Sequence, residues 1–518
     1  MEMNSKRRLI LRRLVACVLF LILFLAVLTR VERLLIEDNG NWAMVAHEAI
    51  PKNSADVAFI GASLVFCDII PQKLMDDYGL ASINASYGGL AFCHNVYELE
   101  WLLQRQRLRV VVVDLFNLGR LSRGFNADSS ALLAPRSIPW TNPLKYSVLA
   151  REITMDPYTL PYLTTIGILH NSIWELTRSA FMNARGQSVV GASFAHYSST
   201  YAVYGKDFDA SVAPDANAVL SELDRATLLR LNELCKANGA ELVLMGLPHL
   251  LDSRWLGMVE EVRALAEEQG IAYLDMDVIM SGSGLHFAAD MADQGHANYQ
   301  GAQKITDFIG QYLKENYDLP DRREDSDPRY DVWKKRPDYF AAYTTGRYII
   351  YVSDFDEWVC EAENLNEDYL LIFATNRAHN AVAAEDINWD IITFLGMLGL
   401  EEAETIAEEE CGWFAIMDGT EIRVEETVHG DLNYAVLVGG HPLTLRASGG
   451  KDLRIKLDNV QINCGHEGLN IILYNKVTHE VIVAACLDLT QEGIALKHND
   501  HADWVNNAIA DTAVDWEE

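Results

Sequence analysis

The sequence has few basic residues for its length. Among 518 residues, 42 are Lys or Arg and 74 are Asp or Glu, so the formal net charge is −32. Phosphate backbones and anionic lipid headgroups repel a chain this acidic. The composition therefore argues against nucleic acid or an anionic membrane surface as a partner, and we expect an acidic, solvated surface.

Cysteine is also scarce, with 8 residues in the whole chain. The cysteines form no Cys-x-x-Cys pair and no His/Cys cluster at zinc spacing, so a disulfide scaffold is excluded and no metal or cofactor is expected. Cys67 and Cys93 form either a disulfide or two buried free thiols. We favour the free thiols.

One long uncharged apolar run, residues 14–29, stands near the N-terminus. Together with the apolar residues 9–11 it approaches the roughly 20 residues that a bilayer core requires. The basic residues before it should stay in the cytoplasm. We predict a cytoplasmic basic tail at 1–8, a transmembrane signal anchor at 9–29 and a stalk at 30–50, with the rest of the chain outside the cell. A cleavable signal peptide is the rival reading, but no small-x-small site follows the run.

A chain of this length favours two or three domains. From residue 51 to 317 the pattern alternates between apolar strands and amphipathic helices, which predicts an α/β domain with a parallel sheet and helices on both faces. Residues 118–215 break this alternation and form an insertion. The expected strands are 55–63, 80–85, 109–116, 241–245 and 271–274, and the expected helices are 71–79, 92–106, 170–182, 216–237, 256–269 and 299–315.

The charged, proline-broken stretch 318–345 is typical of a linker. Beyond it, residues 346–495 predict a second domain of α+β type, and residues 496–518 form an acidic tail. Its expected helix is 386–398, and its expected strands are 348–352, 369–375, 412–417, 421–424, 433–439, 453–457, 469–474 and 481–487.

Candidate chemistry lies at two distant places in the first domain. Ser63 directly follows the first strand, at the edge of a parallel sheet where ligands bind. A serine hydroxyl is a poor nucleophile until a base takes its proton. His296 is the natural base, and Asp293, three residues earlier, can fix its tautomer and stabilise the imidazolium. If the fold brings the three together, they form a catalytic triad.

These stretches resemble a known family. Residues 56–63, residues 84–89 and the motif Asp293-x-x-His296-x-Asn298 are similar to the blocks of the SGNH (GDSL-like) hydrolase superfamily. The nearest branch is the membrane-anchored, extracytoplasmic one, which includes the D-alanyl transfer protein of teichoic-acid modification and the alginate O-acetylation proteins. The resemblance covers about residues 51–317, apart from the insertion. It implies a three-layer parallel-sheet domain with Ser63 as the nucleophile and Asp293 and His296 as its partners.

The same resemblance implies an oxyanion hole made by three groups. They are the N–H of the serine itself, a glycine after the second strand and an asparagine after the third. Gly89 best matches the glycine, with Gly88 as the alternative, and Asn117 matches the asparagine. The chain departs from the family here, because no Gly-x-Asn-Asp sequence stands at that place.

Several other polar residues accompany these motifs. Asn84 and Asn298 are possible supporting residues, although we favour a turn role for Asn84 and a helix-capping role for Asn298. His249 follows a strand and either lines the pocket or is a satisfied surface histidine, which we favour. His286 and Asp290 are expected to be loop residues.

Four stretches of the second domain resemble the interleukin-like EMT inducer (PANDER-like) domain. They are residues 369–375, 412–419, 468–475 and 481–489. The resemblance implies a compact β-sandwich-like fold and, in some glycan-modifying proteins, a sugar-binding module. Trp358, Trp389 and Trp413 either stack on a sugar or belong to the core.

The leading hypothesis is a membrane-anchored serine O-acyl esterase or acyltransferase that modifies a cell-surface polysaccharide or glycolipid through an acyl-Ser63 intermediate. By analogy with the teichoic-acid and alginate systems, a membrane-bound O-acyltransferase is the expected partner of a transferase. The alternative is a catalytically decayed scaffold that presents a glycan- or protein-binding C-terminal domain at the cell surface.

Overall fold

The computed structural model describes residues 2–38, 50–119, 135, 137–155, 203–334, 344–345, 349, 352, 355–376, 386–407, 411–438, 441–447, 453–458, 460–463, 468–476 and 480–489. The chain divides into two compact units, with the boundary between residues 335 and 336. The expected helix at 170–182 and the tail at 496–518 lie outside the described residues.

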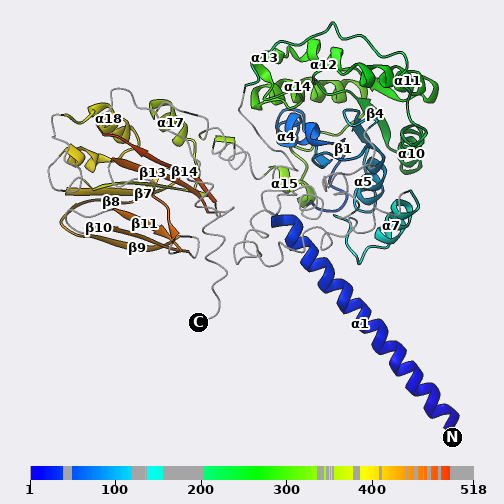
Figure 1. Cartoon of the computed structure of the whole chain (residues 1–518), viewed down its shortest axis with the longest axis horizontal. Coiled ribbons are helices and arrows are strands. Elements are labelled where there is room, and N and C mark those ends of the chain that lie inside the picture. Colours follow the sequence, from blue (N-terminus) through cyan, green and yellow to red (C-terminus); the bar gives the residue numbers. More distant parts are fainter. Residues whose placement is uncertain are drawn as a thin grey trace. The chain divides into compact units, whose positions relative to one another are not determined.

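Helix α1 (Glu2–Asp38) contains the apolar run found in the sequence (Figure 1). Its segment Leu11–Val31 is long and apolar enough to cross a membrane, and none of it is buried within the protein. Side chains such as Leu23 are exposed along it. The segment begins two residues later than the predicted span and is compatible with a membrane or signal anchor. The helix continues to residue 38, where the stalk was expected.

The first unit is built on a five-stranded parallel sheet with the strand order β2-β1-β3-β4-β5. All five predicted strands form, and β1 to β3 are buried along their whole length because helices cover both faces. Their bounds are Val57–Gly61 for β1, Ser82–Ser86 for β2, Val110–Asp114 for β3, Glu241–Met245 for β4 and Ala272–Leu274 for β5.

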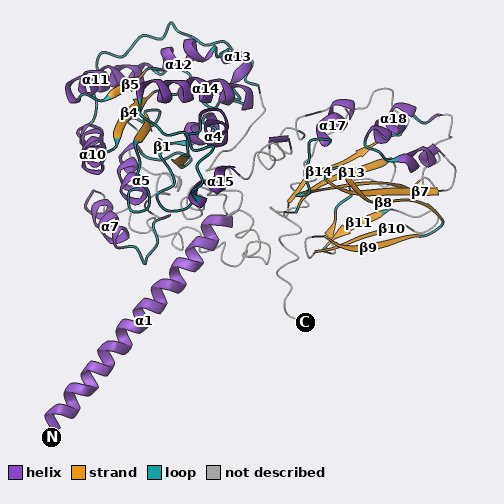
Figure 2. Ribbon diagram, turned by 180° about the vertical axis from the view of Figure 1, so that it is seen from behind, coloured by secondary structure: helices purple, strands orange, loops and turns teal. Residues whose placement is uncertain are grey.

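Alternate residues of the strands face two helical layers. On one face, Ile83 of β2 and Val111 of β3 share a core with Leu99 of α5, Leu231 of α10 and Val262 of α11. On the other face, the Asn84 amide donates to backbone carbonyls of the segment that begins with α3. The unit is therefore a three-layer α/β/α arrangement (Figures 1 and 2). Its helices up to this point are α3 (Ser63–Asp68), α4 (Pro71–Tyr78), α5 (Asn95–Leu102), α7 (Pro143–Met155), α10 (Glu222–Asn238) and α11 (Ser253–Gln269).

Three further helices follow β5, and the last of them corresponds to the helix expected at 299–315. They are α12 (Met276–Ser283), α13 (Phe287–Asp290) and α14 (Tyr299–Asn316). α14 packs against α3 and α4, and Gly310 allows the close approach, since a Cβ there would lie 2.5 Å from the Tyr78 ring. α14 thereby lies beside the helix that begins at Ser63.

The stretch expected to be a linker belongs in part to the first unit. Arg322 donates two hydrogen bonds, of 2.8 and 2.9 Å, to the buried carboxylate of Asp56, just before β1. Trp333 is fully buried, and its indole N–H donates to the Ser82 carbonyl at 3.2 Å. The 3-10 helix η5 (Pro328–Tyr330) and α15 (Asp331–Lys334) lie in this stretch. Residues 318–334 therefore extend the folded unit and do not form a free linker.

The second unit contains two antiparallel sheets. The five-stranded sheet has the order β14-β13-β6-β7-β8, and the four-stranded sheet has the order β12-β11-β10-β9. Leu370 of β6 and Phe414 of β7 share one core with Leu443 and Leu445 of β10, so the two sheets pack face to face. The strands are β6 (Tyr369–Asn376), β7 (Cys411–Asp418), β8 (Glu421–His429), β9 (Leu432–Val438), β10 (His441–Ala447), β11 (Arg454–Leu457), β12 (Val460–Gln461), β13 (Leu469–Asn475) and β14 (Glu480–Leu487).

Helices cover the other face of the five-stranded sheet. Phe355 and Trp358 of α17 (Phe355–Ala362) and Leu395 of α18 (Trp389–Met397) pack with Leu371 of β6, and the 3-10 helix η7 (Glu401–Ala407) joins them. The α+β and sandwich-like expectation therefore describes this unit. Strand β10, α17 and η7 were not predicted, and the strand expected at 348–352 lies largely outside the described residues.

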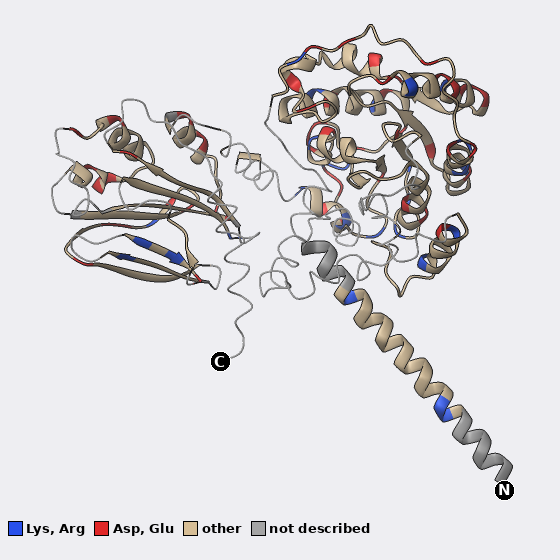
Figure 3. Ribbon diagram, viewed as in Figure 1, with Lys and Arg blue, Asp and Glu red and all other residues tan. Residues whose placement is uncertain are grey.

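Two of the three candidate sugar-stacking tryptophans are core residues. Trp358 and Trp413 are fully buried, whereas Trp389, in the first turn of α18, is 54% exposed. Only Trp389 is therefore free to meet a ligand. Figure 3 shows acidic residues over the helices of both units, as the composition predicts.

Candidate active site

Ser63 lies where β1 meets a short helix. β1 ends at Gly61, and Ser63 is the first residue of α3. A Cβ on Gly61 would lie 2.8 Å from Val65 and 3.0 Å from the Cβ of Asp114. Glycine therefore lets the strand end turn tightly into the helix, beside the end of β3, and presents Ser63 at the carboxyl edge of the sheet.

Asp293 and His296 lie in one loop whose two ends are hydrogen-bonded to each other. Met291 and Ala297 form an antiparallel bridge, and the Ala292 N–H donates to the His296 carbonyl at 2.8 Å. The loop is followed by α14, whose N-cap is Asn298: its side chain accepts the Gly301 N–H at 3.1 Å. The expected capping role of Asn298 is confirmed.

The fold brings the three predicted residues together. His296 Nε2 lies 2.7 Å from Ser63 Oγ, and His296 Nδ1 lies 2.8 Å from Asp293 Oδ2. With Nδ1–H donating to the carboxylate, the neutral ring accepts the Ser63 hydroxyl proton at Nε2. The His296 and Asp293 side chains are 30% and 56% exposed, so solvent reaches the site. This geometry allows His296 to remove a proton from Ser63.

Asp293 is held as a carboxylate. Partial burial raises its pKa, but hydrogen bonds from the Gly295 N–H and from His296 outweigh this, and the pKa lies below its ordinary value of 3.8. Its Oδ1 accepts the N–H groups of Gly295 at 2.8 Å and His296 at 2.9 Å. The same bonds fix the conformation of the loop. Asp293 therefore both orients His296 and stabilises the loop that carries it.

Asp68, at the end of α3, ties this helix to the histidine loop. It is fully buried, and its Oδ1 accepts the Ala297 N–H at 2.9 Å. Burial raises its pKa well above the ordinary value, although the bond from Ala297 lowers it. The Thr306 hydroxyl of α14 donates to the Asp68 carbonyl at 3.3 Å. This positioning role is not predictable from the sequence, because a single acid at a helix end carries no distinctive pattern.

The two oxyanion-hole glycines form a turn beside the end of β1. The Leu90 N–H donates to the Tyr87 carbonyl at 3.2 Å, and the Tyr87 N–H donates to the Gly61 carbonyl at 3.3 Å. Gly89 has φ +69°, which a type II turn requires at its third position. Within the described part of the chain, no hydrogen bond engages the N–H of Gly88 or Gly89. Both remain candidate donors, as does the N–H of Ser63 at the helix start.

Asn117 and Asn84 hold this region together from the side. Asn117 is buried, and its amide donates to the Leu90 carbonyl, so at least one of its N–H bonds serves the glycine turn. Asn84 lies within β2 and not in a turn, and it donates to the carbonyls of Val65 at 3.2 Å and Ile69 at 2.8 Å. The turn role expected for Asn84 is wrong; it anchors the helix that begins at Ser63.

His249 is buried rather than on the surface, and Asp290 lies in a helix rather than in a loop. His249 Nδ1 bonds to the Leu247 carbonyl at 2.8 Å, and burial lowers its pKa to about 4, so the ring is neutral. The surface role expected for it is therefore wrong. Asp290 belongs to α13 and accepts the His286 N–H at 2.6 Å and the Lys304 ammonium at 2.7 Å. His286 precedes α13 and is exposed, so its backbone N–H, and not its ring, makes the contact with Asp290.

Cys67 and Cys93 are free thiols, as we favoured. Cys67 lies one helical turn after Ser63, and burial, then the neighbouring Asp68 and Asp293, raise its pKa. A thiol held in the protonated form is a poor competitor for Ser63 as nucleophile.

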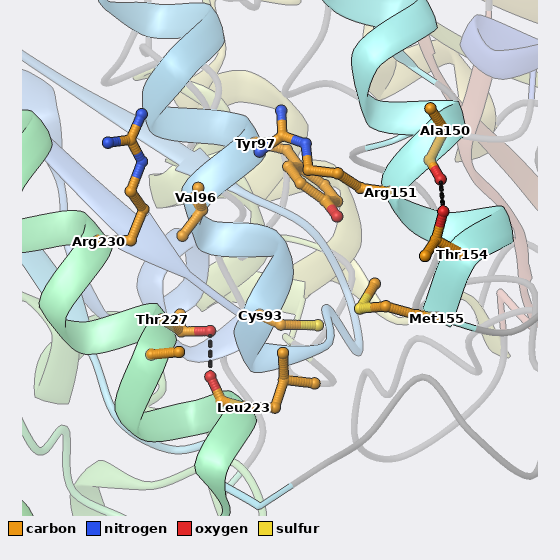
Figure 4. Close-up of a pocket in the computed structure, with 11 residues that line it drawn as sticks. Cys93, Val96, Tyr97, Ala150, Arg151, Thr154, Met155, Leu223, Thr227 and Arg230 are labelled. Carbon is orange, nitrogen blue, oxygen red and sulfur yellow. Dashed lines mark hydrogen bonds between the residues drawn. The ribbon is translucent and has the colours of Figure 1, made fainter.

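A cavity lies away from these residues, between α5, α7 and α10 (Figure 4). It measures about 460 Å³ and is mostly apolar, and none of the three triad residues lines it. Arg151 and Arg230 border it, but both pair with Glu100, at 2.6 and 3.4 Å. Beside it, His94 Nε2 lies 3.1 Å from Glu152. The sequence did not indicate this cavity.

Among the residues that the structure describes, no group of three or more His, Cys, Asp or Glu side chains is arranged to hold a metal ion. Neither a scan against models of known protein families nor a search of curated proteins finds a match for this chain.

Proposed function

We propose that this protein is a membrane-anchored serine O-acyl esterase or acyltransferase that acts on a cell-surface glycan. The observation that carries the proposal is the continuous hydrogen-bonded series Ser63–His296–Asp293 at the carboxyl edge of the parallel sheet. The resemblance of residues 56–63, 84–89 and 293–298 to the SGNH blocks supports the same chemistry. The apolar segment Leu11–Val31 supports the membrane anchor.

In the proposed reaction, Ser63 Oγ attacks the acyl carbonyl carbon while its proton passes to His296 Nε2. Asp293 stabilises the resulting imidazolium, and the N–H groups of Ser63 and of Gly88 or Gly89 receive the oxyanion. His296 then protonates the leaving alcohol, which leaves an acyl-Ser63 ester. Attack by water completes an esterase cycle, and attack by a sugar hydroxyl completes a transferase cycle. A membrane-bound O-acyltransferase would be the partner that supplies the acyl group to a transferase.

A fluorophosphonate probe tests the nucleophile in the full chain in detergent micelles. We expect labelling of Ser63, identified by mass spectrometry, and a loss of labelling rate of at least about 1,000-fold in Ser63→Ala. Ser281→Ala is the matched control, because Ser281 is an exposed serine of α12 whose hydroxyl only bonds back to its own helix. Folded native protein that stays unlabelled would rule out the catalytic proposal and leave the glycan-binding scaffold.

A further inference from the structure

The outer face of the four-stranded sheet has an unusual charge. Along β10, Leu443 and Leu445 are buried against the other sheet, so Thr444 and Arg446 face outward. The same alternation along β11 buries Ile455 and turns Arg454 and Lys456 outward. We call Arg446, Arg454 and Lys456 the basic face; Figure 3 shows Lys and Arg positions in blue on strands of the second unit.

Strand register places the three cations close together. Arg446 is paired directly with Arg454, and Thr444 is paired with Lys456. Directly opposite residues have Cβ atoms about 5 Å apart, and the next residue on the same face lies about 7 Å along the strand. Like charges in directly opposite positions destabilise a sheet. The arrangement is therefore unfavourable unless an anion lies over it.

Neighbouring side chains do not supply that anion. Among the described residues, no ion pair or side-chain hydrogen bond engages the basic face. Elsewhere in this unit, Asp418 pairs with both Arg423 and Lys476. Two described acidic residues flank this sheet in the chain, Asp431 just before β9 and Asp458 directly after β11, and among the described residues no ion pair joins either of them to the basic face. A basic cluster on an outer sheet face that pairs with no acid among the described residues is exceptional in a chain with a net charge of −32.

The surroundings of the basic face suit a sugar chain. In register beside it stand Asn433 opposite Arg446, Ala435 opposite Thr444, and Gln461 opposite Lys456. Amide and hydroxyl groups hydrogen-bond to sugar hydroxyls. The short side chain of Ala435 leaves room above the sheet at its position. The three cations can meet carboxylate, sulfate or phosphate groups along a flexible polymer.

We propose that the basic face binds an anionic polysaccharide. The choice of a polysaccharide over other polyanions rests on the proposed function, while binding itself needs no chemistry at Ser63. A nucleic acid or a broad anionic membrane would bring many negative charges close to the acidic rest of the chain. The resulting repulsion disfavours both. A flexible polysaccharide contacts only the face itself.

Binding of immobilised polygalacturonate to the full chain in detergent micelles tests the proposal, with neutral dextran as the negative probe. We expect Kd on polygalacturonate to rise about tenfold or more in the triple variant Arg446→Gln, Arg454→Gln, Lys456→Gln, and to rise as salt increases from about 50 to about 300 mM. The variant Arg107→Gln, Arg254→Gln, Lys236→Gln is the charge-matched control. It removes two arginines and a lysine that are exposed and have no ion pair in the described first unit, so its Kd should change by less than about twofold.

The triple variant removes repulsion between like charges, so it should fold at least as stably as the native chain. Its fluorophosphonate labelling should be unchanged, which separates failure of this proposal from failure of the proposed function. Equal binding by native protein and triple variant would overturn the proposal. Vesicles of phosphatidylglycerol that compete better than polygalacturonate would overturn it in favour of a membrane surface. Binding that appears only after removal of residues 490–518 would overturn it in favour of the acidic tail as occupant.

Discussion

Asp114 is a buried carboxyl at the sheet edge that carries Ser63. It accepts the N–H groups of Leu247 and Phe116, both at 3.2 Å, and it limits the space around Gly61. Burial raises its pKa from 3.8 to about 7, even though the bonds from Leu247 and Phe116 lower it. Near neutral pH this group is therefore partly protonated in the folded protein.

Asp114 predicts a pH dependence of stability. The folded pKa is raised, so the unfolded chain loses this proton first, and the stabilisation present below pH 3.8 is lost as pH rises towards about 7. Relative to Asp114→Asn, which does not titrate, the native free energy of unfolding should fall by up to about 1.4 kcal/mol per pH unit across that window. Urea titrations of both proteins from pH 4 to pH 8 measure this. A constant difference between the two proteins over the window would contradict the prediction.

At the residue scale, the triad residues are predictable from the sequence, but the buried residues that position them are not. Ser63, Asp293 and His296 were found because their residue types and spacing match a mechanism. Asp68 and Asp114 were missed, because what makes each one important is burial beside a loop that is distant in sequence. The prediction for His249 is wrong for the same reason. The sequence around it does not indicate that Phe116 and Trp255 pack against its ring.

At the element scale, helices with strong end signals were predicted well. α4 begins at Pro71 and ends before Gly79, which has φ +68°, and α14 begins after the capping Asn298. α3 was missed because it has six residues and no side-chain cap, so its stability comes from the bonds of Asn84 and Thr306. The stretch 318–334 was assigned to a linker because its prolines and charges hide the tertiary contacts of Arg322 and Trp333.

The Arg322–Asp56 pair gives a test of that packing. Arg322→Ala leaves the buried Asp56 carboxylate with one described ion-pair partner, Arg109 at 3.5 Å. We therefore expect the free energy of unfolding to fall by about 3 kcal/mol and the Tm to fall by roughly 6–10 °C. Arg329→Ala is the control in the same segment, because Arg329 pairs with the part-exposed Asp327, and it should cost less than about 1 kcal/mol. Calorimetry of the full chain in detergent micelles compares them. Equal small losses would mean that residues 318–334 contribute little to the unit.

At the scale of the whole molecule, each unit has its own hydrophobic core. Leu244 of β4 belongs to the core of the parallel-sheet unit, and Leu371 of β6 belongs to the core under α17 and α18. Both side chains are fully buried. A separate core is what allows a domain to unfold cooperatively by itself, so we expect two thermal transitions in the full chain.

Two cavity-forming substitutions assign these transitions. Leu244→Ala and Leu371→Ala should each cost about 2–5 kcal/mol, because each removes buried methyl groups and leaves a cavity. Leu244→Ala should lower the midpoint temperature of one transition, and Leu371→Ala should lower the midpoint temperature of the other. Neither substitution should abolish a transition. Fluorophosphonate labelling of Ser63 during heating then identifies the transition of the parallel-sheet unit, because only that unit contains the triad. A single transition that both substitutions lower equally would show that the two cores unfold as one cooperative structure, and the two-unit description would then not extend to stability.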